Sequence, residues 1–161
     1  MSEAASDKNR TGEKKAEATR VHFELLDQPD RVEGIARLLL RRNRLEPHVL
    51  ILCPDEGFMA QLDERLWTVH PESFLAHAIA GEDAEANALQ PILLATGIVR
   101  DNDPAVLING CLEVPTEMSG FSHIVDFVDS WDDGLKQAAR ERFRTYRQLE
   151  MDPTYLGTRS E

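Results

Sequence analysis

Residues 48–53 (HVLILC) form an almost unbroken run of apolar, strand-forming residues. A strand with one face in water alternates apolar and polar side chains, so a run of this kind indicates a strand that is covered on both faces. Strands of this kind occur in sheets that carry a helical layer on each side. The run therefore favours an α/β domain.

Strand and helix patterns alternate along the rest of the chain. One helix is predicted to start at Asp30, because Glu33 follows it at the spacing of a capping box, and a second is predicted to start after Pro54 and Asp55. Further strands are predicted at 21–26, 90–98, 105–109 and 123–128. This order predicts a single three-layer α/β domain, with a mixed, mostly parallel sheet and helices on both faces.

The 161 residues suit one domain, which we expect to span 21–150. Residues 1–20 have almost no large apolar side chains and are expected to form a disordered tail. The short polar segment 151–161 is expected to form a flexible C-terminal tail. No apolar run approaches the roughly 18 residues that span a bilayer, and residues 1–20 lack the apolar centre of a signal peptide. We therefore expect a cytoplasmic protein with no membrane contact.

The segment 134–147 (GLKQAARERFRTYR) gathers five basic side chains, although the chain has a formal net charge of −11. A capping box of Ser130 and Asp133 predicts a helix at 131–149. On that helix four cations fall on one side, with Phe143 at their boundary, and we call these four the basic stripe: Lys136, Arg140, Arg144 and Arg147. A stripe like this is either a solvated helix face or a site for an anionic ligand or an acidic peptide.

Arg142 is the exception on this helix, because it projects among the apolar positions. An unpaired guanidinium there would cost several kcal/mol, so we expect a carboxylate partner. The two candidates are Asp126 and Glu72. Arg142 is therefore predicted to have a structural role.

The composition argues against several kinds of site. An acidic chain repels the phosphates of duplex DNA. Cys53 and Cys111 lie too far apart for a CxxC pattern, and the five histidines show no ligand spacing beside them. No glycine-rich phosphate loop is present. We therefore expect neither a metal nor a nucleotide cofactor.

Three segments in the same order resemble a known family: VHFELLD, LDERLWTVHPESFLAHAIAGE and HIVDFVDSWDDGLKQAARERFRTYR. They are similar to the chi subunit of the bacterial DNA polymerase III clamp-loader complex, and the similarity runs from about Val21 to Leu149. The resemblance implies an accessory protein without enzymatic activity, whose α/β fold is like that of nucleotide-binding domains but lacks their site. It also implies two partners, the psi subunit of the clamp loader and the acidic C-terminal tail of single-stranded DNA-binding protein, so DNA is reached only indirectly.

The resemblance also implies which residues bind the tail. The residues expected at this site are Lys136, Arg140, Phe143 and Arg144 on the terminal helix, Trp67, Phe74 and Ile79 as an apolar wall, and Arg147 completing the basic stripe. Arg140 is the expected clamp for the terminal carboxylate of the tail.

Two other functions remain as alternatives. An enzyme could use the strand end at 53–56 (CPDE), either with Cys53 as a nucleophile or with Asp55 and Glu56 as an acid–base pair. The histidines that could activate the thiol are His48, His70 and His77. Alternatively, Trp67, Phe74 and Phe143 beside arginines could stack on single-stranded DNA, although the net charge weighs against this.

Overall fold

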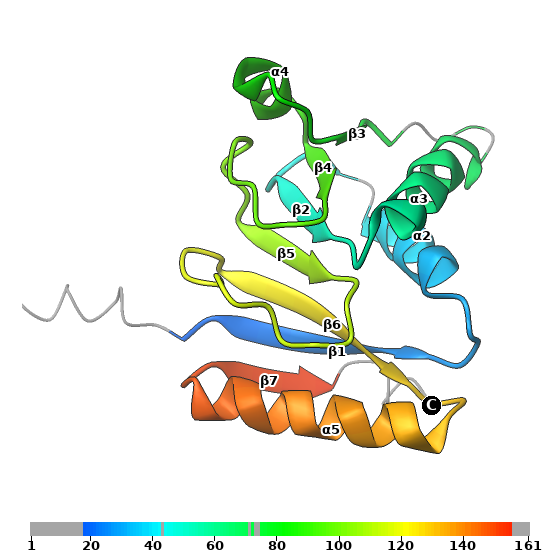
Figure 1. The fold of residues 1–161 in the computed structure, drawn as a ribbon, viewed down its shortest axis with the longest axis vertical. Coiled ribbons are helices and arrows are strands. Elements are labelled where there is room, and N and C mark those ends of the chain that lie inside the picture. The colour runs from blue at the N-terminus through cyan, green and yellow to red at the C-terminus, as the bar shows by residue number, and fades with distance from the viewer. Residues whose placement is uncertain (1–17, 43, 71, 73–74, 156–161) are drawn as a thin grey trace, which may run out of the picture.

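A computed structural model describes residues 18–42, 44–70, 72 and 75–155. Its strands form a seven-stranded sheet in the order β3-β4-β2-β5-β6-β1-β7 (Figure 1). The strands are β1 (Arg20–Leu26), β2 (Val49–Leu52), β3 (Ala78–Ile79), β4 (Ile92–Ala95), β5 (Val106–Asn109), β6 (His123–Asp129) and β7 (Asp152–Tyr155). The helices are α2 (Arg31–Arg42), α3 (Glu56–Thr68), α4 (Ala84–Ala88) and α5 (Asp133–Gln148).

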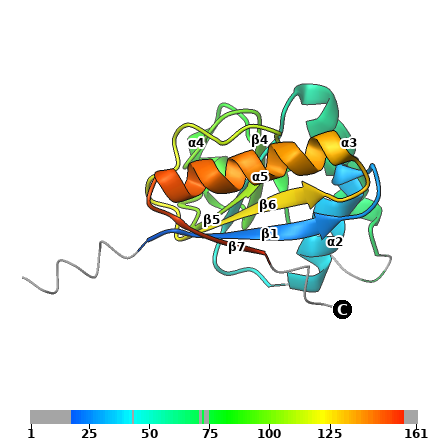
Figure 2. The ribbon, with the colours of Figure 1, turned by 90° about the horizontal axis from the view of Figure 1, so that it is seen from below.

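The three-layer α/β prediction is confirmed, because each face of the sheet carries its own helices and its own core. Helices α2 and α3 cover one face, and α5 covers the other (Figures 1 and 2). Strand β2 contributes to both cores, with Val49 and Ile51 on the α2 side and Leu50 and Leu52 on the α5 side. All of β2 is buried, as the apolar run at 48–53 predicted.

The expectation of a mixed sheet is wrong in detail, because every pair of neighbouring strands among the described residues is parallel. Strands β4 and β5 are consecutive in the chain but do not pair with each other. Instead both strands pair with β2, which lies between them. The connection from β4 to β5 therefore steps across one strand, and this step keeps the direction of both strands the same.

Each of the three long helices begins at an aspartate that accepts a hydrogen bond from the first helical turn. Asp30 accepts from the backbone N of Glu33 (3.0 Å), and Asp55 accepts from that of Phe58 (2.8 Å). At α5 the cap is Asp132, which accepts from Leu135 N (2.8 Å), so the prediction of a Ser130 cap is wrong. The hydroxyl of Ser130 instead donates to the Leu26 carbonyl (3.2 Å).

The first residues of the C-terminal segment form a strand, although a flexible tail was expected there. Residues Asp152–Tyr155 form β7, which pairs with β1 from Arg20↔Asp152 to Phe23↔Tyr155, so a flexible tail from 151 onward is wrong for these residues. Pro153 is compatible with this pairing because β7 is an edge strand. Residues 156–161 lie outside the described residues, as do 1–17 of the expected N-terminal tail, whereas Arg20 already belongs to β1.

Candidate functional site

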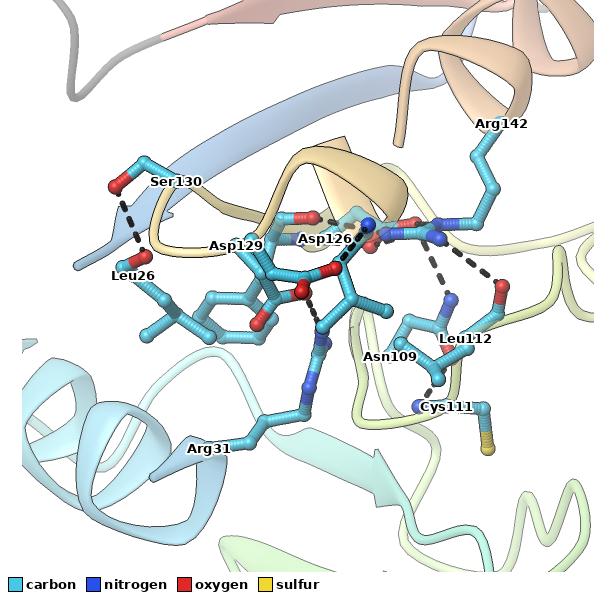
Figure 3. A network of polar contacts seen from close by, with 12 residues as sticks. Leu26, Arg31, Asn109, Cys111, Leu112, Asp126, Asp129, Ser130 and Arg142 are labelled. Atoms are coloured by element: carbon cyan, nitrogen blue, oxygen red, sulfur yellow. Dashed lines mark hydrogen bonds and ion pairs between the residues drawn. The ribbon is translucent and has the colours of Figure 1, made fainter. Parts of the chain in front are cut away.

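A buried ion pair attaches α5 to the sheet. The Arg142 Nε lies 3.1 Å and 3.3 Å from the two carboxylate oxygens of Asp126 on β6, and both side chains are buried, with exposed fractions of 4% and 0%. The remaining guanidinium nitrogens donate to the carbonyls of Leu112 and Phe127, both at 2.9 Å. Figure 3 shows Arg142 reaching into this network. The prediction of a carboxylate partner is confirmed, and the partner is Asp126 rather than Glu72.

Asp126 also accepts hydrogen bonds from two other elements. The hydroxyl of Tyr146 on α5 donates to it at 2.6 Å, and the side-chain amide of Asn109 on β5 donates at 3.2 Å. Burial, together with the nearby Asp126 charge, raises the pKa of Tyr146 above its ordinary value, so the phenol stays protonated. The carboxylate therefore joins β5, β6 and α5 and holds the orientation of that helix.

A groove lies beside the N-terminal half of α5, where the sheet ends. Its volume is about 300 Å³, and we call it the cationic groove; its lining residues are Leu25, Val128, Ser130, Lys136, Arg140 and Tyr155. Leu25 and Val128 are paired on β1 and β6. Strand β7 ends at Tyr155 opposite Phe23, so it does not cover Leu25, which is 43% exposed. An apolar floor is thus open to solvent next to two cations.

The two cations of the groove have few partners within the protein. The Arg140 Nη1 donates to the Gln137 side chain (3.2 Å), and no carboxylate pairs with Arg140 in the described part of the chain. Lys136 lies 3.9 Å from Asp133, whose side chain is fully exposed. An exposed pair at this distance contributes little. Both cations are therefore available to an anionic ligand.

The other residues of α5 that were predicted to bind the tail do not line the groove directly. Phe143 stacks on Tyr155, with ring centroids 4.9 Å apart and an angle of 11° between the rings, so it supports the groove wall from behind. Arg147 lies over the Phe143 ring, with its guanidinium carbon 5.1 Å from the ring centroid. Arg144 is exposed on the same helix, one turn beyond Arg140. The predicted stripe is therefore real, but only its first half forms the groove.

The predicted apolar wall is in another place. Ile79 lies on β3, the strand at the opposite edge of the sheet from β7, and Trp67 lies on α3, on the face opposite α5 (Figure 1). The expectation that these residues share a pocket with Arg140 is therefore wrong, because the width of the sheet separates them. Phe74 lies outside the described residues. Leu25, Val128 and Tyr155 line the cationic groove and were not among the predicted residues, although alternation along β6 places Val128 on the same face as Asp126.

The strand end proposed for an enzyme lacks an activated nucleophile. Cys53 is buried, and burial raises the pKa of its thiol to about 12, so the thiolate is scarce at neutral pH. Its sulfur approaches the Ile51 carbonyl at 3.9 Å. His48 lies at the other end of β2 and contacts the Asn102 carbonyl (2.8 Å), while Asp55 caps α3. The arrangement therefore favours structural roles for these residues.

Two kinds of feature are absent from the described residues. They contain no group of three or more histidine, cysteine, aspartate or glutamate side chains placed to hold a metal ion. None of the described helices is long and apolar enough to cross a membrane.

Solved structures with a similar fold share little sequence identity with this chain. The T4 protein UvsW matches with a TM-score of 0.58 at 8% identity, covering 88% of this chain and 41% of that one. The C-terminal domain of Dbp5 from S. cerevisiae matches with a TM-score of 0.54 at 12% identity, covering 86% of this chain and 89% of that one. At these identities the likeness shows the α/β fold alone.

Relatives that are similar in sequence identify the family of this chain, which the structural likeness alone does not. The family described as DNA polymerase III chi subunit, HolC, matches residues 18–154. DNA polymerase III subunit chi of Pseudomonas aeruginosa is 36% identical over 133 residues, covering 81% of this chain and 90% of the relative. The protein of the same name from Escherichia coli is 35% identical over 133 residues, covering 78% and 88%. The chain therefore belongs to the DNA polymerase III chi subunit family.

Proposed function

We propose that the cationic groove binds the acidic C-terminal tail of single-stranded DNA-binding protein. The observation that supports this most is the groove itself, where an exposed apolar floor adjoins Lys136 and Arg140. A peptide end that carries both an apolar side chain and a carboxylate has the complementary chemistry. In this proposal the protein is a cytoplasmic accessory subunit without a catalytic site or cofactor, and it links that partner to the clamp loader.

The binding energy would come from two contacts at the end of the tail. The terminal apolar side chain packs between Leu25, Val128 and Tyr155, while the guanidinium of Arg140 takes the terminal carboxylate. Acidic residues earlier in the tail face Lys136 and Arg144. A desolvated anchor and its charge-assisted contact carry most of the energy of a small interface, while outer charges steer the approach. An affinity in the micromolar range, about −8 kcal/mol, suits a contact of this size.

The net charge of the chain makes the position of the cations important. At −11 the protein as a whole repels an acidic peptide, so the attraction has to come from charges close to the contact. Long-range charge effects fall off beyond about 8 Å at physiological salt, whereas a direct carboxylate contact persists. A local basic stripe on an acidic protein thus favours the end of a tail over an extended polyanion such as DNA.

This preference can be tested with two labelled ligands. An acidic peptide that ends in a free phenylalanine carboxylate is expected to bind with a micromolar dissociation constant in fluorescence anisotropy. A single-stranded oligonucleotide of similar labelling is expected to show no saturation over the same concentrations. Tight binding of the oligonucleotide, with none of the peptide, would favour the direct DNA-binding alternative instead.

We further propose that the psi subunit binds at the opposite edge of the sheet. Trp67 is 55% exposed and Ile79 is 39% exposed there, on and beside the edge strand β3. Exposed apolar groups at a sheet edge are suited to a protein partner. Because β3 and β7 are the two outer strands, psi and the tail would bind simultaneously.

The substitution Trp67→Ala distinguishes the proposed psi surface from the proposed tail surface. It is expected to reduce co-purification of psi with the full chain, because it removes a large exposed anchor. Binding of the tail peptide, measured on the same preparation, should remain within about twofold of wild type. A loss of peptide binding with retention of psi would place Trp67 at the tail site and contradict this assignment.

A further inference from the structure

A second hollow lies at the carboxyl ends of the strands, and we call it the edge hollow. Its volume is about 260 Å³. Apolar side chains from the starts of three helices and from the segment after β5 form its wall, namely Pro29, Pro54, Phe58, Leu112, Trp131 and Leu135. The ion pair between Arg31 on α2 and Asp129 at the end of β6 also lines it, and Figure 3 shows these two side chains reaching toward each other.

Two large apolar side chains in the wall of the edge hollow are exposed to solvent. Leu112 is 45% exposed and Trp131 is 44% exposed, and both border the same concavity. A single exposed apolar side chain needs no explanation, but two on one concave site indicate that it receives a ligand. The floor requires glycine at position 110, because a Cβ there would lie 2.7 Å from the Leu52 carbonyl. The concavity is thus shaped partly by backbone.

The negative charge around the edge hollow argues against a phosphate, which is the usual ligand at this position in α/β domains. In α/β domains, phosphates bind at the carboxyl edge of the sheet on helix N-termini. Here α2, α3 and α5 all begin at this edge, and the carboxylates of Asp30, Asp55 and Asp132 already occupy their first turns. An anion would be repelled by these groups.

Two carboxylates line the edge hollow, Asp30 at the start of α2 and Asp129 at the end of β6. Three exposed acidic residues follow capping or lining residues directly in the chain, namely Glu56, Glu113 and Asp133. The cation that lines the hollow, Arg31, is already paired with Asp129. The surroundings of the edge hollow are therefore acidic, in contrast to the cationic groove, whose lining residues on α5 are Lys136 and Arg140.

We propose that the edge hollow binds a segment of a partner protein in which an apolar side chain lies next to a lysine or arginine. The apolar side chain packs between Leu112 and Trp131, and the cation lies against the surrounding carboxylates. The surface is separate from the cationic groove and from the Trp67 edge, and its assignment does not depend on either. Two neighbouring surfaces beside the N-terminal half of α5 would then select ligands of opposite charge.

Trp131 allows a direct test, because the chain has only two tryptophans. In the full chain carrying Trp67→Phe, fluorescence reports on Trp131 alone. The probes are two tetrapeptides with both ends blocked, one with leucine and phenylalanine between two lysines and one with the same pair between two glutamates. The lysine peptide is expected to change the emission saturably, with a dissociation constant on the order of 0.1 to 1 mM. The glutamate peptide is expected to bind at least about tenfold more weakly.

Two leucines provide a matched control for the same titration. Leu112→Ala is expected to weaken binding of the lysine peptide by about fivefold or more. Leu149→Ala removes a side chain of similar exposure (50%) at the far end of α5 and should leave binding unchanged. An unsaturable response, equal binding of the two peptides, or equal effects of the two substitutions would overturn the proposal. Self-association that Leu112→Ala abolishes would also overturn it and would assign the hollow to a second copy of this chain.

Discussion

Asp126→Ala is expected to lower the free energy of unfolding by about 3 to 5 kcal/mol, the largest loss that we predict for one substitution. The change leaves the Arg142 guanidinium buried without a counter-charge and removes the acceptor of Tyr146 and Asn109. Urea denaturation followed by circular dichroism measures the effect. Because α5 carries Lys136 and Arg140, the same variant should also weaken tail binding.

Two comparisons show whether the loss comes from the uncompensated charge. Arg140→Ala changes an exposed cation on the same helix and should alter stability by no more than about 0.5 kcal/mol. The double variant Asp126→Leu with Arg142→Met removes both charges. It should therefore be more stable than the single variant Asp126→Leu, which leaves Arg142 without a counter-charge. A loss below about 1 kcal/mol for Asp126→Ala would mean that the network does not hold α5 in place.

The second large effect is on binding. Arg140→Ala is expected to weaken binding of the tail peptide by at least about 1.5 kcal/mol, which is roughly tenfold, because a charge-assisted contact to a carboxylate is lost. Isothermal calorimetry gives both affinities directly. Arg140 is exposed and bonds only to Gln137 among the described residues, so the fold should be unaffected.

The other cations of the helix provide the controls for this effect. Arg147 lies over the Phe143 ring rather than in the groove, so Arg147→Ala should cost well under half as much. Arg144→Ala should have an intermediate effect that decreases with added salt, since its contribution is a longer-range attraction. Equal losses for all three arginines would indicate a diffuse charge effect instead of a clamp at Arg140.

The parts of the fold that depend on local patterns could be predicted from the sequence. The apolar run at 48–53 identified a strand with two covered faces, and β2 is buried on both. Helical periodicity placed Arg142 among apolar neighbours, which was enough to require a carboxylate and to suggest Asp126. The aspartates at positions 30 and 55 marked the helix starts because a cap is a local interaction.

What the sequence left open depends on long-range pairing. Strand β7 is short, polar and interrupted by Pro153, and it is stabilised by pairing with β1 from the other end of the chain. Without that strand, Tyr155 could not be recognised as a groove residue. The order of the strands decides where Ile79 lies, and no local pattern reveals that β3 and β7 are at opposite edges. Of the residues predicted for the tail site, Lys136 and Arg140 line the groove, whereas Trp67 and Ile79 do not.

We propose that the guanidinium of Arg140 binds the free carboxylate at the end of an acidic tail. Calorimetry of wild type and Arg140→Ala, each with the acid and the amidated form of one tail peptide, tests it in a single thermodynamic cycle. We predict that Arg140→Ala weakens binding of the acid form about tenfold or more, and that it hardly changes binding of the amide. Equal losses for both peptide forms, or equal affinity of the wild type for acid and amide, would contradict the claim.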